Sequence, residues 1–175
     1  MWKNLLLAIT TKPSISKKIK SSVNGNLIPV EGPESGKFVA LEYYGMILNR
    51  TYFIAAANGF LCGANVGGLL SNRRSPTDPN WYLHQGELKR CREDGLGSDL
   101  FLTSKSSNFR ISPEEVLSID FDDTPKWGMG MVPYSGRLHF KLSNGRSREF
   151  ILLGAQDGQH LRENLFEIGF GATSE

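Results

Sequence analysis

The sequence from Arg137 to Leu153, RLHFKLSNGRSREFILL, decides the fold. In its first half polar and apolar side chains alternate, as in a half-buried strand, and one face collects Leu138, Phe140 and Leu142. A three-residue turn at 143–145, with Gly145 in the left-handed conformation, then returns the chain so that Phe150 joins the same apolar face. The stretch therefore predicts a β-hairpin with strands at 137–142 and 147–153.

An amphipathic helix is predicted directly after the hairpin, at residues 157–168. Gly169 stands where a left-handed residue would end this helix. The second hairpin strand also carries Ile151 and Leu153 on its other face. We therefore expect that strand to be covered on both sides, with the helix as the additional cover. The apolar side chains that the helix is expected to bury are Leu161, Leu165 and Ile168.

The rest of the chain must supply further strands, because one hairpin and one helix are too little for a stable domain. Asn58-Gly59 marks a second hairpin turn, and the capping box at 112–115 predicts one helical turn before another strand. We expect a mainly β fold, a partly open antiparallel barrel or sandwich of about seven strands capped by a C-terminal α-helix. The alternative is an α+β layer with the helix on one sheet face. The additional strands are predicted at 38–44, 46–57, 60–66, 99–104 and 116–122.

Length and composition fit one globular domain, with 175 residues, 39% of them hydrophobic and 22% charged. We assign residues 1–30 to a basic N-terminal segment and linker, and residues 31–175 to a single β-rich domain with a loop insertion at 73–98. Residues 31–175 carry a net charge of −3, from 15 basic and 18 acidic side chains, which argues against a nucleic-acid partner. Cys62 and Cys91 lack metal-ligand spacing and indicate reduced thiols, hence a cytoplasmic location.

The N-terminal residues 1–12 have a helical apolar stripe whose continuous apolar run is too short for a signal-peptide core. Two interpretations stay open: the segment packs on its own domain, or it makes weak contact with an anionic membrane surface, which would make the chain a peripheral membrane adaptor. Residues 51–72 carry no charge, but their Gly and Asn residues favour a buried hairpin over a membrane span. The membrane-contact residues of the second interpretation are Trp2, Lys3, Lys12, Lys17, Lys18 and Lys20.

The stretch 73–97 is irregular, with turn residues before Trp81 and Tyr82 and a short charged helix predicted at 86–94. Long loops and aromatic side chains are both enriched at interfaces, so this insertion is a candidate protein-binding surface. The other interpretation is that the two aromatics hold the insertion onto the barrel and that its charges form a solvated face. The candidate partner-binding residues are Trp81, Tyr82, Arg73, Arg74, Lys89 and Arg90.

No motif in the chain predicts a catalytic, cofactor-binding or metal site. GPESGK at 32–37 lacks the spacing and the final Ser or Thr of a phosphate-binding loop. Asp120 and Asp122 share one strand face, but that pattern is more typical of a solvated outer face than of a cation site. The histidines form no ligand pair, because they are far apart in the sequence: His84, His139 and His160.

The count and order of these elements resemble the pleckstrin-homology-like (PH-like) barrel, including its GRAM-type branch, over residues 37–170. The segment FRISPEEVLSIDF at 109–121 is similar to the polar turn and strand of those domains. GRLHFKLSNGRSREFIL at 136–152, followed by LRENLFEIGF at 161–170, is similar to their last hairpin and capping helix.

Two departures from the PH-like pattern bear on function. Many PH domains carry a tryptophan in the capping helix, where this chain has Phe166 and Phe170. Members that bind phosphoinositides place Lys and Arg around the first hairpin turn, whereas the turn at 43–46, YYGM, offers no cation. The resemblance therefore implies a protein-binding or scaffold role. We expect a non-catalytic interaction module that binds a protein partner or itself, without a cofactor.

Overall fold

The computed structural model describes residues 36–44, 48–67 and 77–171. The predictions that concern the N-terminal segment, the tip of the first hairpin and the pair Arg73 and Arg74 lie outside these residues.

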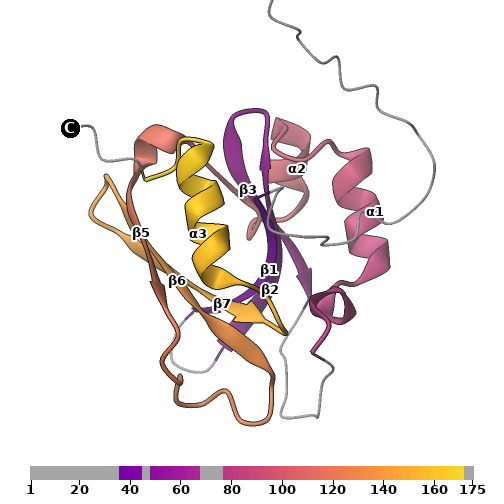
Figure 1. Ribbon diagram of the computed structural model, residues 1–175. Helices are drawn as coiled ribbons and strands as arrows, with labels where there is room; N and C mark the ends of the chain where they lie inside the picture. The colour runs from indigo at the N-terminus through magenta and orange to yellow at the C-terminus, as the bar shows by residue number, and fades with distance from the viewer. Residues whose placement is uncertain (1–35, 45–47, 68–76, 172–175) are drawn as a thin grey trace, which may run out of the picture.

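Seven antiparallel strands form one sheet that curls into a half-barrel, as the sequence predicts (Figure 1). The order β4-β3-β2-β1-β7-β6-β5 joins two meanders through the pairing of β1 with β7, where Ala40 lies opposite Leu152. The strands are β1 (Lys37–Tyr44), β2 (Leu48–Ala57), β3 (Phe60–Gly67), β4 (Phe109–Ile111), β5 (Val116–Asp122), β6 (Tyr134–Leu142) and β7 (Ser147–Leu153).

Residues 99–104, predicted as a strand, form the helix α2 (Asp99–Ser104) instead. Ser98 decides this, because its Oγ accepts a hydrogen bond from Phe101 N at 3.0 Å and so caps the start of the helix. The fourth strand is β4, which pairs with β3. The short helices predicted near 86–94 and after Ser112 are confirmed. The remaining helical elements are η2 (Pro79–Tyr82), α1 (Gln85–Glu93), η3 (Pro113–Glu115) and α3 (Gly158–Glu167).

The hairpin of β6 and β7 has the predicted geometry. Gly145 has a φ of 77°, and Leu142 N donates to Arg146 O at 2.8 Å, which closes a three-residue turn. Leu138 lies opposite Phe150 in the register, and both side chains are fully buried. The hairpin therefore places its apolar side chains on one face of the sheet.

The sheet is apolar on both faces, which divides the core into two. We call the face that carries Phe150 the inner face and the face that carries Ile151 the outer face; both side chains are fully buried, so the predicted two-sided cover of β7 is confirmed. The source of the outer cover differs from the prediction. Helix α3 packs on the inner face against β5 and β6, and the outer face is covered by α1 and α2 (Figure 1).

Helix α3 ends before its predicted apolar stripe does. Leu161 and Leu165 are buried as predicted, but Ile168 is 48% exposed, so its predicted burial is wrong. Ile168 is the C-cap, and Gly169 follows in the left-handed conformation with a φ of 97°. The next residue, Phe170, donates its N–H to Leu165 O at 2.9 Å, as in a Schellman motif. This turn places Phe170 in the inner core, where Ile168 was expected.

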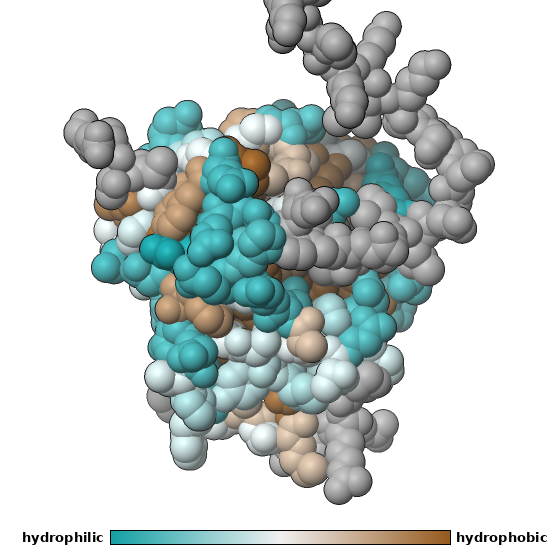
Figure 2. Space-filling model, viewed as in Figure 1, coloured by the Kyte–Doolittle hydropathy of each residue, from teal (hydrophilic) through white to brown (hydrophobic). Residues whose placement is uncertain are grey.

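Helix α3 also reaches the free edge of the sheet. Strand β5 is the last strand, and Arg162 Nε donates to Ile119 O on it at 2.8 Å. The surface over α3 is hydrophilic, as Figure 2 shows. The helix therefore covers the inner core at the open side of the half-barrel, with its apolar side on the core and its polar side in solvent.

The insertion between β3 and β4 closes the outer face. Its side chains Tyr82, Leu88 and Phe101 are buried against that face together with residues of β1, β2, β3 and β7. The start of the insertion is attached to the end of β7, because Ala155 N donates to Thr77 O at 2.7 Å. The described part of the insertion is thus an integral layer of the domain.

Both cysteines are buried free thiols, and Cys62 lies on β3 as predicted. Burial raises the pKa of the Cys62 thiol to about 11, which keeps it protonated and unreactive at neutral pH. Among the described helices, none has both the length and the apolar content that crossing a membrane requires.

Candidate functional site

The connection from β5 to β6, residues 123–133, is a long surface segment that hydrogen bonds and ion pairs hold against the sheet. It begins with a local turn, in which Thr124 N and Oγ1 both donate to Asp122 Oδ1, at 2.8 and 2.6 Å. Gly128 and Gly130 both have positive φ, 91° and 58°, which bends the chain back toward the outer face of β1. We call this segment the β5–β6 loop.

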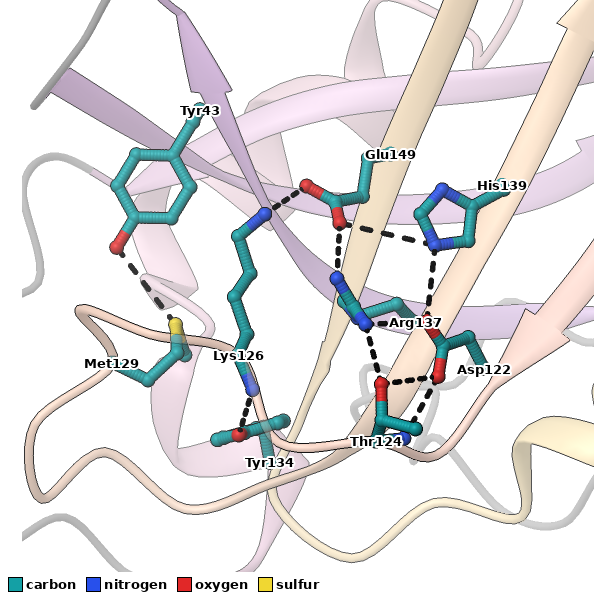
Figure 3. A network of polar contacts seen from close by, with 9 residues as sticks. All are labelled: Tyr43, Asp122, Thr124, Lys126, Met129, Tyr134, Arg137, His139 and Glu149. Carbon is teal, nitrogen blue, oxygen red and sulfur yellow. Dashed lines mark hydrogen bonds and ion pairs between the residues drawn. The ribbon is translucent and has the colours of Figure 1, made fainter.

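A network of ion pairs fixes the first half of the β5–β6 loop to the sheet (Figure 3). The strand register creates it, because Asp122 lies opposite Arg137 and Glu149 lies opposite His139. Arg137 bridges both carboxylates: it binds Asp122, and its Nη1 donates to Glu149 Oε1 at 3.0 Å. Lys126 of the loop completes the network by pairing with Glu149. The loop is therefore tied to β7 through one carboxylate that two cations share.

The second half of the β5–β6 loop is held by a tyrosine and by apolar packing. The hydroxyl of Tyr134 accepts a hydrogen bond from Lys126 N at 2.6 Å. Met129 and Val132 are buried in the outer core, and Tyr43 Oη donates to Met129 Sδ at 3.8 Å (Figure 3). The loop is thus attached on both sides of residues 127 and 128.

Trp127 stands between these attachments and projects into solvent. Its side chain is 97% exposed, and Met131 in the same loop is 54% exposed. A large aromatic side chain left in water by a loop that is otherwise fixed is an informative feature, because burying it would be strongly favourable.

The two carboxylates of the network stay ionised at neutral pH. The hydrogen bonds from Thr124, together with the positive charge of Arg137, lower the pKa of Asp122. Burial alone would raise the pKa of Glu149, but the hydrogen bond and charge of Lys126, together with the hydrogen bond from Arg137, outweigh it and lower that pKa. Both groups therefore act as fixed hydrogen-bond acceptors.

His139 lies at the centre of the network, with Nε2 3.8 Å from both Asp122 Oδ2 and Glu149 Oε1. Arg137 already occupies the space between these carboxylates. In the described ranges, no group of three His, Cys, Asp or Glu side chains is placed to hold a metal ion. We call the network of Asp122, Lys126, Arg137 and Glu149 the brace. It holds the loop on the sheet, and its two positive and two negative charges balance one another.

The brace predicts a pH dependence of stability. A carboxyl whose folded-state pKa is lowered adds stability at neutral pH that is lost as the pH falls through the folded-state value, below about pH 4.3 for Glu. Urea unfolding should show Glu149→Gln to be less stable than the wild type by on the order of 1 kcal/mol at pH 7. That difference should shrink at pH 3. Glu163→Gln, on the exposed face of α3, is the control; an equal effect there would contradict a specific role for the brace.

A cavity of about 160 Å³ lies beside the β5–β6 loop. Trp127 precedes its wall in the chain, because the next residue, Gly128, lines the cavity. Tyr43 and Met129, which are joined by the hydrogen bond from Tyr43 Oη to Met129 Sδ, both line it. The full lining is Leu41, Tyr43, Asn49, Gly128, Met129, Gly130 and Val132. We call this the loop cavity.

A wider depression of about 410 Å³ lies near the end of β3 and the start of α1. Its charged groups bind one another: Lys105 Nζ is 2.5 Å from Glu87 Oε2 and donates to Asn65 O at 2.9 Å. The charge of Lys105 is thus already matched within the protein, which makes this depression a weaker candidate for an anionic ligand than its size suggests.

The two aromatics of the insertion contact each other edge to face, with ring centroids 5.3 Å apart, but they differ in exposure. Trp81 is 54% exposed and remains a surface residue, whereas Tyr82 is only 6% exposed and packs in the outer core. Tyr82 as it stands is not accessible to a partner. It holds the insertion onto the sheet, which was the other interpretation of this pair.

The predicted basic residues of the insertion that the structure describes are engaged with acidic neighbours. Lys89 is highly exposed and lies 3.8 Å from Glu93, and Arg90 donates to Glu87 at 2.8 Å. Arg73 and Arg74 lie outside the described residues. So do all the candidate membrane-contact residues: Trp2, Lys3, Lys12, Lys17, Lys18 and Lys20.

Trp127 was not singled out by the sequence, although it carries the same signal as Trp81. Both tryptophans stand in connections rich in Pro, Gly and Asp. The β5–β6 connection is also much longer than an antiparallel hairpin needs, which is typical of functional loops. These two signals together would have indicated Trp127.

In comparisons of the chain with models of protein families, with curated proteins and with solved structures, nothing matches.

Proposed function

We propose that this chain is a non-catalytic interaction module that binds a protein partner through the β5–β6 loop. The observation that carries the proposal is the 97% exposure of Trp127 on a loop that is fixed on both sides of it. Tryptophan is among the residues that contribute most to protein–protein binding. A loop held in one conformation before binding also loses less conformational entropy when it binds.

The charge of the loop favours a protein over a polyanion. The β5–β6 loop carries one acidic and one basic side chain, Asp123 and Lys126, and Lys126 is paired with Glu149. Anionic membranes and nucleic acids are bound mainly through unpaired clusters of Lys and Arg. An exposed indole on a nearly neutral surface is better suited to a partner with an apolar pocket.

The scaffold in this proposal is a PH-like half-barrel of the GRAM-type branch. The strand order and the position of α3 after the last hairpin are compatible with it. A scaffold role without phosphoinositide binding is supported by Arg148, whose guanidinium forms two hydrogen bonds with Glu42, at 2.7 and 2.6 Å. That cation near the first hairpin is therefore matched within the protein. The proposed location is the cytoplasm.

The proposal is tested by photo-crosslinking from the loop itself. A photoreactive amino acid is placed at Met131, which leaves Trp127 in position, and the full-length protein is irradiated in cells of its native source. We expect adducts to a protein of discrete mass. These should disappear when Trp127→Ala is added and persist when Trp81→Ala is added. The same probe at Lys89, on α1, is the control for non-specific capture. The absence of a Trp127-dependent protein adduct would reject the proposal.

The membrane adaptor remains the second candidate, and a vesicle assay separates it from the first. Vesicles with and without phosphatidylserine are sedimented with the full-length protein, with a variant that lacks residues 1–20 and with Trp127→Ala. Binding that needs phosphatidylserine, weakens with salt, vanishes with the truncation and ignores Trp127→Ala would decide for the adaptor.

A further inference from the structure

We infer that the partner of the β5–β6 loop is a second copy of this chain, and that two copies exchange their Trp127 side chains. Each indole enters the loop cavity of the other copy. The inference rests on the proposed function, because it names the partner of the same loop.

The loop cavity has the size that this insertion needs. Its volume is about 160 Å³. A cavity of roughly 150 Å³ in a protein interior holds a benzene molecule, so this one has room for the larger part of an indole ring. Its walls include Leu41, Met129 and Val132, which are apolar and buried, so a ring that enters it leaves water.

The chemistry of the cavity also suits an indole. A buried indole needs an acceptor for its N–H, and Tyr43, a lining residue of the cavity, carries a hydroxyl oxygen that can accept. The Tyr43 proton is directed at Met129 Sδ, 3.8 Å away, so the lone pairs of the oxygen can accept while the hydroxyl donates. The same thioether makes a favourable contact with an aromatic ring.

The cavity lies next to Trp127, so the same surface on two copies can be complementary. The indole projects from residue 127, and residue 128 already belongs to the cavity wall. Trp127 is 97% exposed, so it does not fill the cavity of its own chain. A projecting side chain next to a pocket of matching size produces a closed dimer when two copies meet about a two-fold axis, because each copy offers both halves of the contact.

Electrostatics does not oppose this contact. Like surfaces repel when they carry the same net charge, but the β5–β6 loop has one charge of each sign. The brace beneath it pairs Lys126 and Arg137 with Glu149 and Asp122. Two such surfaces can therefore approach without a cluster of like charges.

The expected dimer is weak. Two indoles that each bury about 150 to 250 Å² give roughly 300 to 500 Å², and the walls of the two cavities add little, because Leu41, Met129 and Val132 are already buried. Stable interfaces bury about 1,200 to 2,000 Å². We therefore expect self-association with a dissociation constant in the micromolar range, visible as a dependence on protein concentration.

Sedimentation velocity of the full-length protein, from about 1 to about 300 μM, tests the inference in that affinity range. The wild type should shift from monomer to dimer. Trp127→Ala should remain monomeric throughout, and Trp81→Ala, which removes the other exposed tryptophan of the described residues, should behave as the wild type. Tyr43→Phe removes the acceptor together with the hydrogen bond to Met129, and should raise the dissociation constant several-fold. Circular dichroism confirms that each variant is folded.

A wild type that stays monomeric at the highest concentration would overturn the inference, and so would a dimer that Trp127→Ala leaves unchanged. The two proposals fail in different ways. A Trp127-dependent crosslink to a different protein, with a monomeric wild type, rejects the second copy as partner and leaves the interaction module intact. A crosslink of twice the chain mass that depends on Trp127 supports both.

Discussion

Replacing Gly154 with alanine is expected to lower the free energy of unfolding by about 2 to 5 kcal/mol, because two penalties combine there. Gly154 has a φ of 74°, which a residue with a side chain adopts only under strain. A Cβ at this position would also stand 2.3 Å from Thr77 O. That oxygen accepts the hydrogen bond from Ala155 N that attaches the insertion to β7, so the clash falls on the contact itself.

Gly59→Ala is the matched control for Gly154→Ala. Its φ is 80°, so the backbone strain is similar, but a Cβ there meets no other atom within 4 Å. Urea unfolding should show a loss of about 1 kcal/mol for Gly59→Ala and a clearly larger loss for Gly154→Ala. Equal losses would mean that the insertion is not packed tightly against the end of β7.

Leu165→Ala is expected to lower the free energy of unfolding by about 2 to 4 kcal/mol, since it leaves a cavity in the inner core. Leu165 is fully buried where α3 packs against β5 and β6. The control lies on the same helix: Ile168→Ala should cost less than about 0.5 kcal/mol, because Ile168 is 48% exposed. Thermal or urea unfolding of both variants measures the difference. A small loss for Leu165→Ala would show that α3 contributes little to the core.

Local signals predicted the hairpins and the helical turn of the capping box, because in these cases the residues that specify the geometry lie next to one another in the sequence. The alternation in 137–142 and the glycine of the following turn fix the face and the register of β6 and β7 within one short stretch. The same holds for η3, where Ser112 and Glu115 form the capping box that the sequence shows.

Two errors in the predicted fold arose where a local pattern allowed two outcomes. DLFLTS at 99–104 is a short apolar run between polar residues, which fits a strand or a helix, but a hydrogen bond to the Ser98 hydroxyl selects the helix. The apolar stripe of α3 predicts that one side of the helix is buried. It does not predict which face of the sheet the helix packs on. The choice of face depends on the path of the chain after β7 and on the insertion, which already covers the outer face.

The contacts that hold the candidate site together could not be predicted from local patterns, for a similar reason. Trp81 and Trp127 look alike in sequence, and they differ in what fixes the chain around them. The brace needs Lys126 of the loop and Glu149 of β7 to meet, and this follows only from the register of β5, β6 and β7. The loop cavity likewise combines β1, β2 and the β5–β6 loop.

The hydrogen bond from Arg162 to Ile119 protects one of the two edges that every open β-sheet leaves unpaired. An unpaired edge strand is a template to which strands of other molecules can add, which leads to fibrils. β4, at one edge, has only three residues. At the other edge, a guanidinium on α3 occupies the Ile119 carbonyl and sets a positive charge beside the β5 backbone. A charge at this place opposes the addition of a further strand, as charged side chains on the edge strands of other sheets do.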